Sequence, residues 1–176
     1  MGSGESDLSV EIREATVADV PAIFALICGL AEYEKLSHQV TATEDQLRET
    51  LFGRRPAADV LLAYAGNECA GFALFFPNYS TFLAKPGIFL EDLYVKPEWR
   101  GRGVGRALLV RVAQIARERG CGRLEWEVLD WNEPSIGFYK SLGAVAMDEW
   151  TKYRVIGEAL EKLAAGGEML AAGGTS

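Results

Sequence analysis

The sequence predicts one α/β domain built around a central sheet. Stretches in which apolar residues recur at helical spacing alternate with short runs rich in branched and aromatic residues, which are typical of strands. The 176 residues suit about one domain, and 49% of them are hydrophobic while 24% are charged, a balance typical of globular proteins. We therefore expect the element order β-α-α-β-β-β-α-β-α-β-(α) in a single folded unit.

The first half of the chain carries two helix start signals. Thr16 and Asp19 have the T-x-x-D spacing of a capping box, and apolar residues continue at helical spacing to about Tyr33. Thr43 and Gln46 form a second capping box. The elements expected here are a strand over 10–13, helices over about 16–33 and 43–51, and strands over 60–65 and 69–76 joined by a tight turn at 66–67.

The second half of the chain contains a glycine-rich turn between a strand and an amphipathic helix. Gly120 and Gly122 end that helix, and Asn132 with Pro134 starts a shorter one that ends at Gly143. The elements expected here are strands over 87–95 and 124–129, helices over about 105–119 and 132–143, a single strand or hairpin over 144–156, and a last helix over 158–164. The folded domain is expected to span 9–165, with 1–8 and 166–176 as flexible termini.

Charge and cysteine content exclude several classes of protein. Lys and Arg number 18 against 25 Asp and Glu, a net charge of −7, and such a chain does not bind nucleic acid or an anionic membrane by bulk charge. Cys28, Cys69 and Cys121 lie far apart without a CxxC pair, which argues against a zinc site and a disulfide framework. His38, the only histidine, is expected in a surface loop. With no secretory signal or membrane-spanning stretch in the sequence, we expect a cytoplasmic protein.

The glycine-rich turn reads Arg100-Gly-Arg-Gly-Val-Gly105-Arg106. The free N–H groups and the dipole of the helix that follows favour a phosphate, the glycines let the backbone approach it closely, and the arginines add positive charge. A Rossmann fingerprint fails because its third glycine would fall at Arg106, and a Walker A loop fails because the chain has no Gly-Lys dipeptide. A turn without a ligand is the alternative interpretation.

Two motifs together resemble the GNAT superfamily of acetyl-coenzyme A-dependent N-acetyltransferases. The first is the R-x-x-G-x-G pattern from Arg100 to Gly105, and the second, from Asn132 to Gly143, resembles N-x-x-(S/A)-x-x-(F/L)-Y-x-x-x-G. The segments WNEPSIGFYKSLGA, FLEDLYV and LAEYE are similar to the diamine (spermidine/spermine-type) acetyltransferase branch. The likeness spans roughly 10–164 and implies a mixed, mostly antiparallel sheet that is splayed at the coenzyme site, with helices on both faces.

The resemblance implies that acetyl-coenzyme A is the cosubstrate and that no metal is required. The implied coenzyme contacts lie at a strand end, in the glycine-rich turn and at the start of the short helix. They are Leu93, Tyr94, Val95, Arg100, Gly101, Arg102, Gly103, Val104, Gly105, Arg106, Asn132, Glu133, Pro134, Ser135 and Tyr139.

Acetyl transfer to an amine requires that an ammonium lose its proton and that the leaving thiolate gain one. By resemblance, Tyr139 protonates the thiolate, and Glu91 is either the base, acting through water, or a ligand of the substrate ammonium. Glu91 and Asp92 point to opposite faces of an ideal strand, so one of them is expected inside or in a cleft, where burial raises a carboxyl pKa. A packed core tyrosine and a structural salt bridge are the alternatives for Tyr139 and Glu91.

The resemblance also places acidic and aromatic residues around a channel for the amine. Such side chains attract a cation by charge and by cation–π contact. The residues are Tyr33, Glu34, Glu91, Glu125, Trp126, Glu127 and Asp148 or Glu149. A solvated surface position is the alternative for each acid.

The sequence thus predicts a homodimeric N-acetyltransferase that acts on a small primary amine (a polyamine, a diamine or a thialysine-like amine) in a ternary complex. No cysteine has a neighbouring base, which argues against a covalent acetyl-enzyme. The alternatives are an acetyltransferase of peptide or protein amines and a catalytically silent coenzyme A-binding module.

Overall fold

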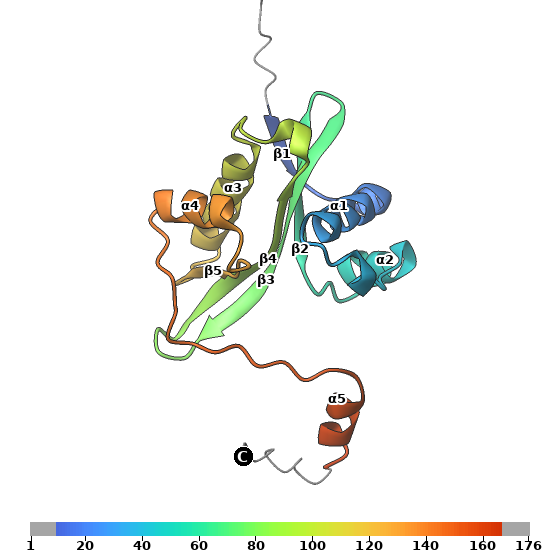
Figure 1. Cartoon of the computed structure of the whole chain (residues 1–176), viewed down its shortest axis with the longest axis vertical. Coiled ribbons are helices and arrows are strands. Elements are labelled where there is room, and N and C mark those ends of the chain that lie inside the picture. The colour runs from blue at the N-terminus through green and yellow to red at the C-terminus, as the bar shows by residue number, and fades with distance from the viewer. Residues whose placement is uncertain (1–9, 167–176) are drawn as a thin grey trace, which may run out of the picture. The chain divides into compact units, whose positions relative to one another are not determined.

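The computed structural model describes residues 10–166 and contains a five-stranded sheet in the order β1-β2-β3-β4-β5 (Figure 1). Strands β1 to β4 are antiparallel neighbours, and β5 joins β4 in parallel. The strands are β1 (Val10–Glu14), β2 (Asp59–Ala65), β3 (Glu68–Ser80), β4 (Lys85–Val95) and β5 (Leu124–Trp126). The predicted mixed, mostly antiparallel sheet is confirmed. The chain divides into two compact units, and the boundary in the sequence lies between Glu127 and Val128.

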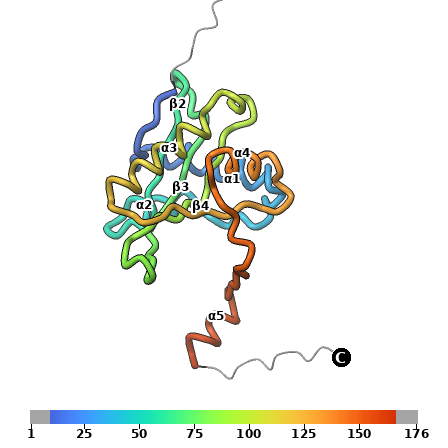
Figure 2. Tube along the Cα trace, turned by 90° about the vertical axis from the view of Figure 1, so that its left-hand side faces the viewer, coloured from blue at the N-terminus to red at the C-terminus, as the bar shows by residue number. Residues whose placement is uncertain are grey.

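Helices cover both faces of the sheet in the first unit, as predicted. In Figure 1, α3 lies on one side of the strands and α1 with α2 on the other, and Figure 2 views the same trace from the α3 side. The helices are α1 (Val20–Tyr33), α2 (Glu44–Phe52) and α3 (Val104–Glu118), with short 3-10 helices over Val17–Asp19, Ser37–Gln39 and Pro97–Trp99. His38 is exposed, as expected of a surface residue.

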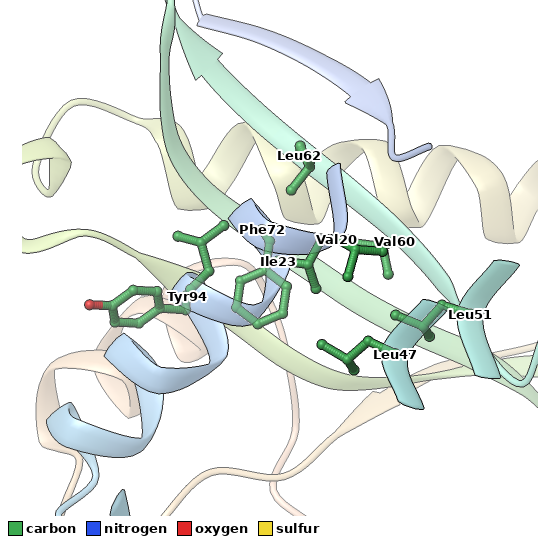
Figure 3. Packing of buried hydrophobic residues seen from close by; sticks show 9 residues of the cluster. Val20, Ile23, Leu47, Leu51, Val60, Leu62, Phe72 and Tyr94 are labelled. Carbon is green, nitrogen blue, oxygen red and sulfur yellow. The ribbon is translucent and has the colours of Figure 1, made fainter. Parts of the chain in front are cut away.

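The core between α1, α2 and the sheet includes Tyr94 of β4. Side chains of both helices and of three strands meet there: Val20, Ile23, Leu26, Leu47, Leu51, Val60, Leu62, Phe72 and Tyr94 (Figure 3). Burial of each large apolar side chain contributes roughly 1.5–3 kcal/mol. Helix α1 approaches Tyr94 closely because it has a glycine there, since a Cβ on Gly29 would stand 2.8 Å from the Tyr94 hydroxyl oxygen.

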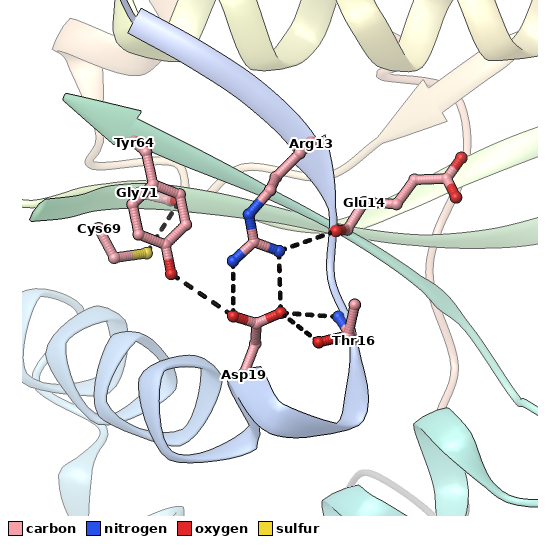
Figure 4. A network of polar contacts seen from close by, with 7 residues as sticks. All are labelled: Arg13, Glu14, Thr16, Asp19, Tyr64, Cys69 and Gly71. Carbon is pink, nitrogen blue, oxygen red and sulfur yellow. Dashed lines mark hydrogen bonds and ion pairs between the residues drawn. The ribbon is translucent and has the colours of Figure 1, made fainter. Parts of the chain in front are cut away.

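A partly buried ion pair fixes the start of α1. The guanidinium of Arg13 donates to both carboxylate oxygens of Asp19, at 2.9 and 2.7 Å, and the Thr16 backbone N–H donates to the same carboxylate at 2.7 Å (Figure 4). The Tyr64 hydroxyl lies 3.5 Å from it. Hydrogen bonds from Arg13 hold the pKa of Asp19 well below its usual range. The predicted capping box is therefore present, and it joins α1 to β1 and β2.

The second unit differs from the prediction in its last strand. It contains α4 (Glu133–Ser141) and α5 (Gly157–Ala164), both of which were expected. The strand or hairpin predicted over 144–156 is wrong, because that segment has no regular structure. A strand requires a neighbour that pairs with its N–H and C=O groups, and no described segment pairs with this one. The predicted strand over 124–129 is also shorter, ending at Trp126.

Two further observations concern the described residues. None of their helices has the length and apolar character needed to cross a membrane. Cys28, Cys69 and Cys121 are partly buried, unpaired thiols. The predicted flexible termini, 1–8 and 166–176, lie outside the described residues except for Gly166.

Candidate active site

A β-bulge at Glu91 shapes the middle of β4. Leu74 of β3 stands opposite Asp92, and the next residue, Phe75, stands opposite Leu90, so Glu91 is the extra residue. Phe75 faces α3, because the guanidinium of Arg119 lies 5.8 Å from its ring centroid, whereas Leu74 packs against the α1/α2 core. The bulge therefore sends Leu90 and Asp92 to opposite faces of the sheet, although they are two residues apart.

Asp92 is half-buried on the α1 face, whereas Glu91 is exposed. Burial, and after it the negative charges of Glu91 and Glu34, together raise the pKa of Asp92 to about 7. Glu34 is the C-cap residue of α1, and burial raises its pKa as well. These carboxyls form a cluster of negative charge that suits an ammonium, and a carboxyl with a pKa of about 7 exchanges its proton near neutral pH.

The edge of β4 beyond the bulge is open. Strand β5 pairs with β4 only through Ile88, Phe89 and Leu90, while β4 continues to Val95. Among the strands of residues 10–127, none lies beside 91–95 on the side away from β3. Backbone N–H and C=O groups on such an edge accept an extended ligand as they would accept another strand. The sheet is therefore splayed at the place where the sequence predicts coenzyme contacts from Leu93, Tyr94 and Val95.

The glycine-rich turn leads from this strand end into α3. Gly101 and Gly103 have φ values of 73° and 80°, a left-handed backbone conformation that favours glycine. A Cβ built on either residue would have no atom within 4 Å other than those of its chain neighbours, so the space beside the backbone is open. Gly103 is the N-cap of α3 and no side chain caps the helix there, so the N–H groups of Val104 and Gly105 begin it. This geometry agrees with the predicted phosphate cradle.

The three arginines of this turn have different surroundings. The guanidinium carbon of Arg102 lies 5.0 Å from the Trp99 ring centroid, within the loop itself. Arg106 is exposed on the first turn of α3. Arg100 instead extends toward α1, where its guanidinium carbon lies 4.3 Å from the ring centroid of Tyr33. The sequence grouped all three as coenzyme ligands and gave no sign of this difference.

The second coenzyme motif lies on α4, in the second unit. The Asn132 side-chain oxygen accepts a hydrogen bond from the Ser135 backbone N–H at 3.3 Å, and a proline follows in the first turn, as predicted. Ser135 and Tyr139 are four residues apart and share one face of the helix. The rings of Phe138 and Tyr139 lie 5.4 Å apart. The roles of Glu133, Pro134, Ser135 and Tyr139 toward coenzyme stay predictions.

The acids predicted to line the amine channel separate into groups. Glu34 lies close enough to Asp92 to raise its pKa. Glu125 stands opposite Phe89 in the β4/β5 register, and its carboxylate accepts a hydrogen bond from the Asn78 side chain at 2.8 Å and pairs with the Arg123 guanidinium at 2.9 Å. These contacts link β5 to β3 and to the residues before β5, and the role of Glu125 toward the amine stays a prediction.

The other predicted channel residues lie on β5, directly after it, and in the second unit. Trp126 stands opposite Leu90, so strand alternation places it on the face opposite to Glu125. Glu127 follows the end of β5, and Asp148 and Glu149 are exposed residues of the second unit. Their roles stay predictions.

Family comparison agrees with this site. A model described as the Acetyltransferase (GNAT) family matches residues 24–144, which is more than half of the chain. The chain therefore belongs to the GNAT family, and it is an N-acetyltransferase. Within the chain the matched segment includes the bulge, the open strand edge, the glycine-rich turn and α4.

Individual relatives narrow the comparison. The chain is 42% identical over 167 residues to a thialysine N-epsilon-acetyltransferase of Sus scrofa, covering 89% of this chain and 98% of the relative. It is 36% identical over 197 residues to an L-ornithine N5-acetyltransferase of Arabidopsis thaliana, covering 86% of each. A solved integron cassette protein from the mobile metagenome of V. cholerae superposes with a TM-score of 0.76 at 28% identity, covering 89% of this chain and 98% of that one. These relatives agree with the predicted diamine-acetyltransferase-like branch.

Proposed function

We propose that this protein transfers the acetyl group of acetyl-coenzyme A to a primary amino group of a small, multiply charged amine. The observation that carries the proposal is the pair of half-buried carboxyls, Asp92 and Glu34, at the open edge of β4. This cluster of negative charge would hold a cation, and the strand edge beside it suits an extended, amide-containing arm. Family membership supports acetyl-coenzyme A as the cosubstrate.

The residues of the first unit fit that cosubstrate. Leu93, Tyr94 and Val95 would bind its pantetheine arm through their backbone, and the N–H groups at the start of α3 would bind its pyrophosphate. Gly101 and Gly103 leave the space that phosphate oxygens require. When bound, acetyl-coenzyme A supplies the acetyl group as a thioester, which the amine attacks directly.

Two neighbouring carboxyls are candidates to take the ammonium proton. Glu91, the residue suggested by family resemblance, is exposed and would work through water. Asp92 is half-buried, and its pKa of about 7 matches the pH at which a general base is most effective. We assign the role of base, which takes the ammonium proton, to Asp92. Glu91 would orient the water molecule through which this proton passes. Glu34 then holds the charge that remains on the amine.

Tyr139 would donate its phenolic proton to the sulfur as the thioester C–S bond breaks, and solvent would restore that proton. A phenol is a suitable donor because its ordinary pKa of about 10 lies above that of a thiol, about 8.5, by only a small margin. Asn132 and Ser135 support this role by fixing the start of α4, the helix that carries Tyr139.

The acceptor is proposed to be a diamine, either an amino acid with a side-chain amine or a polyamine. Thialysine and ornithine, the compounds that give two relatives their names, each carry two amino groups, so one can accept acetyl while the other stays charged. We further propose that the enzyme is a cytoplasmic homodimer, an expectation supported by family likeness. Light scattering on the purified protein tests the dimer.

The function is tested by thiol release from acetyl-coenzyme A with a panel of amines. The panel contains thialysine, ornithine, lysine, putrescine, spermidine and a lysine-containing peptide. Turnover with one of the small diamines well above that with the peptide supports the proposal, and a preference for the peptide identifies a protein-amine acetyltransferase instead. Coenzyme binding without turnover of any amine would identify a silent binding module.

A further inference from the structure

Arg100 connects three elements that meet at the active site. Its guanidinium carbon lies 4.3 Å from the ring centroid of Tyr33 in α1 and 5.7 Å from that of Tyr94 in β4. Its Nε donates a hydrogen bond to the Val95 carbonyl at 2.9 Å. We infer that Arg100 is a positioning residue that couples coenzyme binding at the glycine-rich turn to amine binding at the end of α1.

The contacts of Arg100 restrict the orientation of its guanidinium. The Nε hydrogen bond ties the plane of the group to the end of β4, and the Tyr33 ring lies against it from α1. A cation–π contact of this kind holds the guanidinium against the ring, and it is stronger the further the pair is desolvated. Lysine lacks both the Nε donor and the flat group, so it cannot reproduce this arrangement.

Tyr33 links this contact to the cluster of carboxyls. It is the last residue of α1, and Glu34, whose charge acts on Asp92 in that cluster, follows it directly. The chain then leaves the helix through Lys35, which has a left-handed φ of 61°. Because the helix ends at this point, the contact of the Tyr33 ring with Arg100 restricts the position of the next residue, Glu34. A change in the position of Arg100 therefore changes the placement of Glu34 relative to Asp92.

Tyr94 gives the arrangement a rigid base. It belongs to the buried core, and its hydroxyl lies against Gly29 one turn before Tyr33. Arg100 thus rests on one ring that is fixed and one ring that stands at a helix end. When coenzyme binds at the glycine-rich turn, it holds the backbone that carries Arg100, and through the Tyr33 ring the end of α1 is held in the position that binds the amine. Binding of either ligand then strengthens binding of the other by the same factor.

This inference rests on the proposed function, and its test separates the two. The full chain is titrated with coenzyme A in a calorimeter, and with thialysine in the absence and presence of saturating coenzyme A. For the wild type we expect coenzyme A to strengthen thialysine binding about 5-fold or more. Absence of coenzyme A binding by the wild type contradicts the proposed function, whereas coenzyme A binding without this strengthening contradicts only the role of Arg100.

Variants assign the coupling to the stacked guanidinium. Arg100→Gln and Arg100→Lys are expected to bind coenzyme A within about 3-fold of the wild type and to lose the strengthening of thialysine binding. Arg102→Gln, the matched variant in the same turn, is expected to weaken coenzyme A binding and to retain the strengthening. The inference is overturned if Arg100→Gln weakens coenzyme A as Arg102→Gln does and keeps the coupling, or if Arg100→Lys keeps it.

A second set of variants approaches the contact from α1. Tyr33→Phe keeps the ring and is expected to keep the coupling, whereas Tyr33→Leu is expected to lose it. The double variant Arg100→Gln/Tyr33→Leu is expected to show no further loss of coupling than either single variant, because both remove one interaction. Additive losses would contradict the inference. Thermal unfolding of each variant checks that it is folded.

Discussion

Replacing Asp92 by asparagine tests whether the ionised Asp92 carboxylate destabilises the folded protein when no cation is bound beside it. Asparagine keeps the shape of the side chain and removes its charge. Burial, together with the charges of Glu91 and Glu34, raises the pKa of Asp92 from the ordinary 3.8 to about 7, so the folded state binds this proton more tightly than the unfolded state does. Ionisation of Asp92 therefore destabilises the folded protein.

The size of this effect and its pH dependence follow from the two pKa values. The destabilisation is absent below the unfolded pKa of about 3.8, grows as the pH rises to about 7, and is constant above that. At pH 8 it amounts to at most about 4 kcal/mol, since each pH unit between the two pKa values corresponds to about 1.4 kcal/mol. We expect Asp92→Asn to be more stable than the wild type at pH 8 by about 1–4 kcal/mol and equally stable near pH 4.

Denaturant unfolding followed by tryptophan fluorescence, without ligands and across this pH range, measures the difference. Glu91→Gln is the control for stability, because Glu91 is exposed and its removal only relieves its repulsion of Asp92, so the free energy of unfolding at pH 8 is expected to rise by less than about 0.5 kcal/mol. A stability difference for Asp92→Asn that does not vary with pH, or an equal gain for Glu91→Gln, would refute the reasoning.

The same variant tests the assignment of the base. The wild-type kcat/KM is expected to rise with pH through about 7 as Asp92 ionises, and Asp92→Asn is expected to lose this limb together with roughly 100-fold or more of its rate. An unchanged pH profile in Asp92→Asn, combined with its loss in Glu91→Gln, would assign the base to Glu91.

Three further variants test other parts of the site. Tyr139→Phe is expected to lower kcat roughly 100-fold with little change in coenzyme A affinity, and unchanged turnover would remove Tyr139 as the acid. Gly103→Val places a branched residue at a φ of 80°, which costs about 1–2 kcal/mol, and calorimetry should show coenzyme A binding weakened about 10-fold; normal affinity would contradict the phosphate cradle. Gly71→Ala puts a Cβ 2.5 Å from the Tyr94 carbonyl oxygen, so β3 and β4 must separate there, and a loss of about 1–3 kcal/mol is expected in thermal unfolding. An unchanged melting temperature would count against that close approach.

Most elements of the first unit could be predicted from local signals. The capping boxes at Thr16 and Thr43, the two-residue turn at Gly66-Asn67 and the helix after the glycine-rich turn each depend on a few neighbouring residues, and all are present. The strand expected over 144–156 failed because strand formation depends on a partner that no local pattern specifies.

The site was harder to predict, for a similar reason. Alternation along β4 indicated that Glu91 or Asp92 would be enclosed, and the bulge decided in favour of Asp92. A bulge depends on the register between two strands, which the sequence of one strand does not contain. The contact between Arg100 and Tyr33 joins residues far apart in the chain, so nothing near the glycine-rich turn indicated it.

The bulge also divides β4 into two segments in which different properties restrict amino-acid substitution. Before it, Ile88 and Leu90 belong to the core under α3, where volume and shape restrict substitution. After it, Asp92 and the strand end face the ligands, where charge and backbone access matter. A change of acceptor can therefore arise by substitution after Glu91 without repacking of the α3 core. Gain or loss of one residue at this point would instead exchange the two faces of the strand and remove both the core and the cluster of carboxyls.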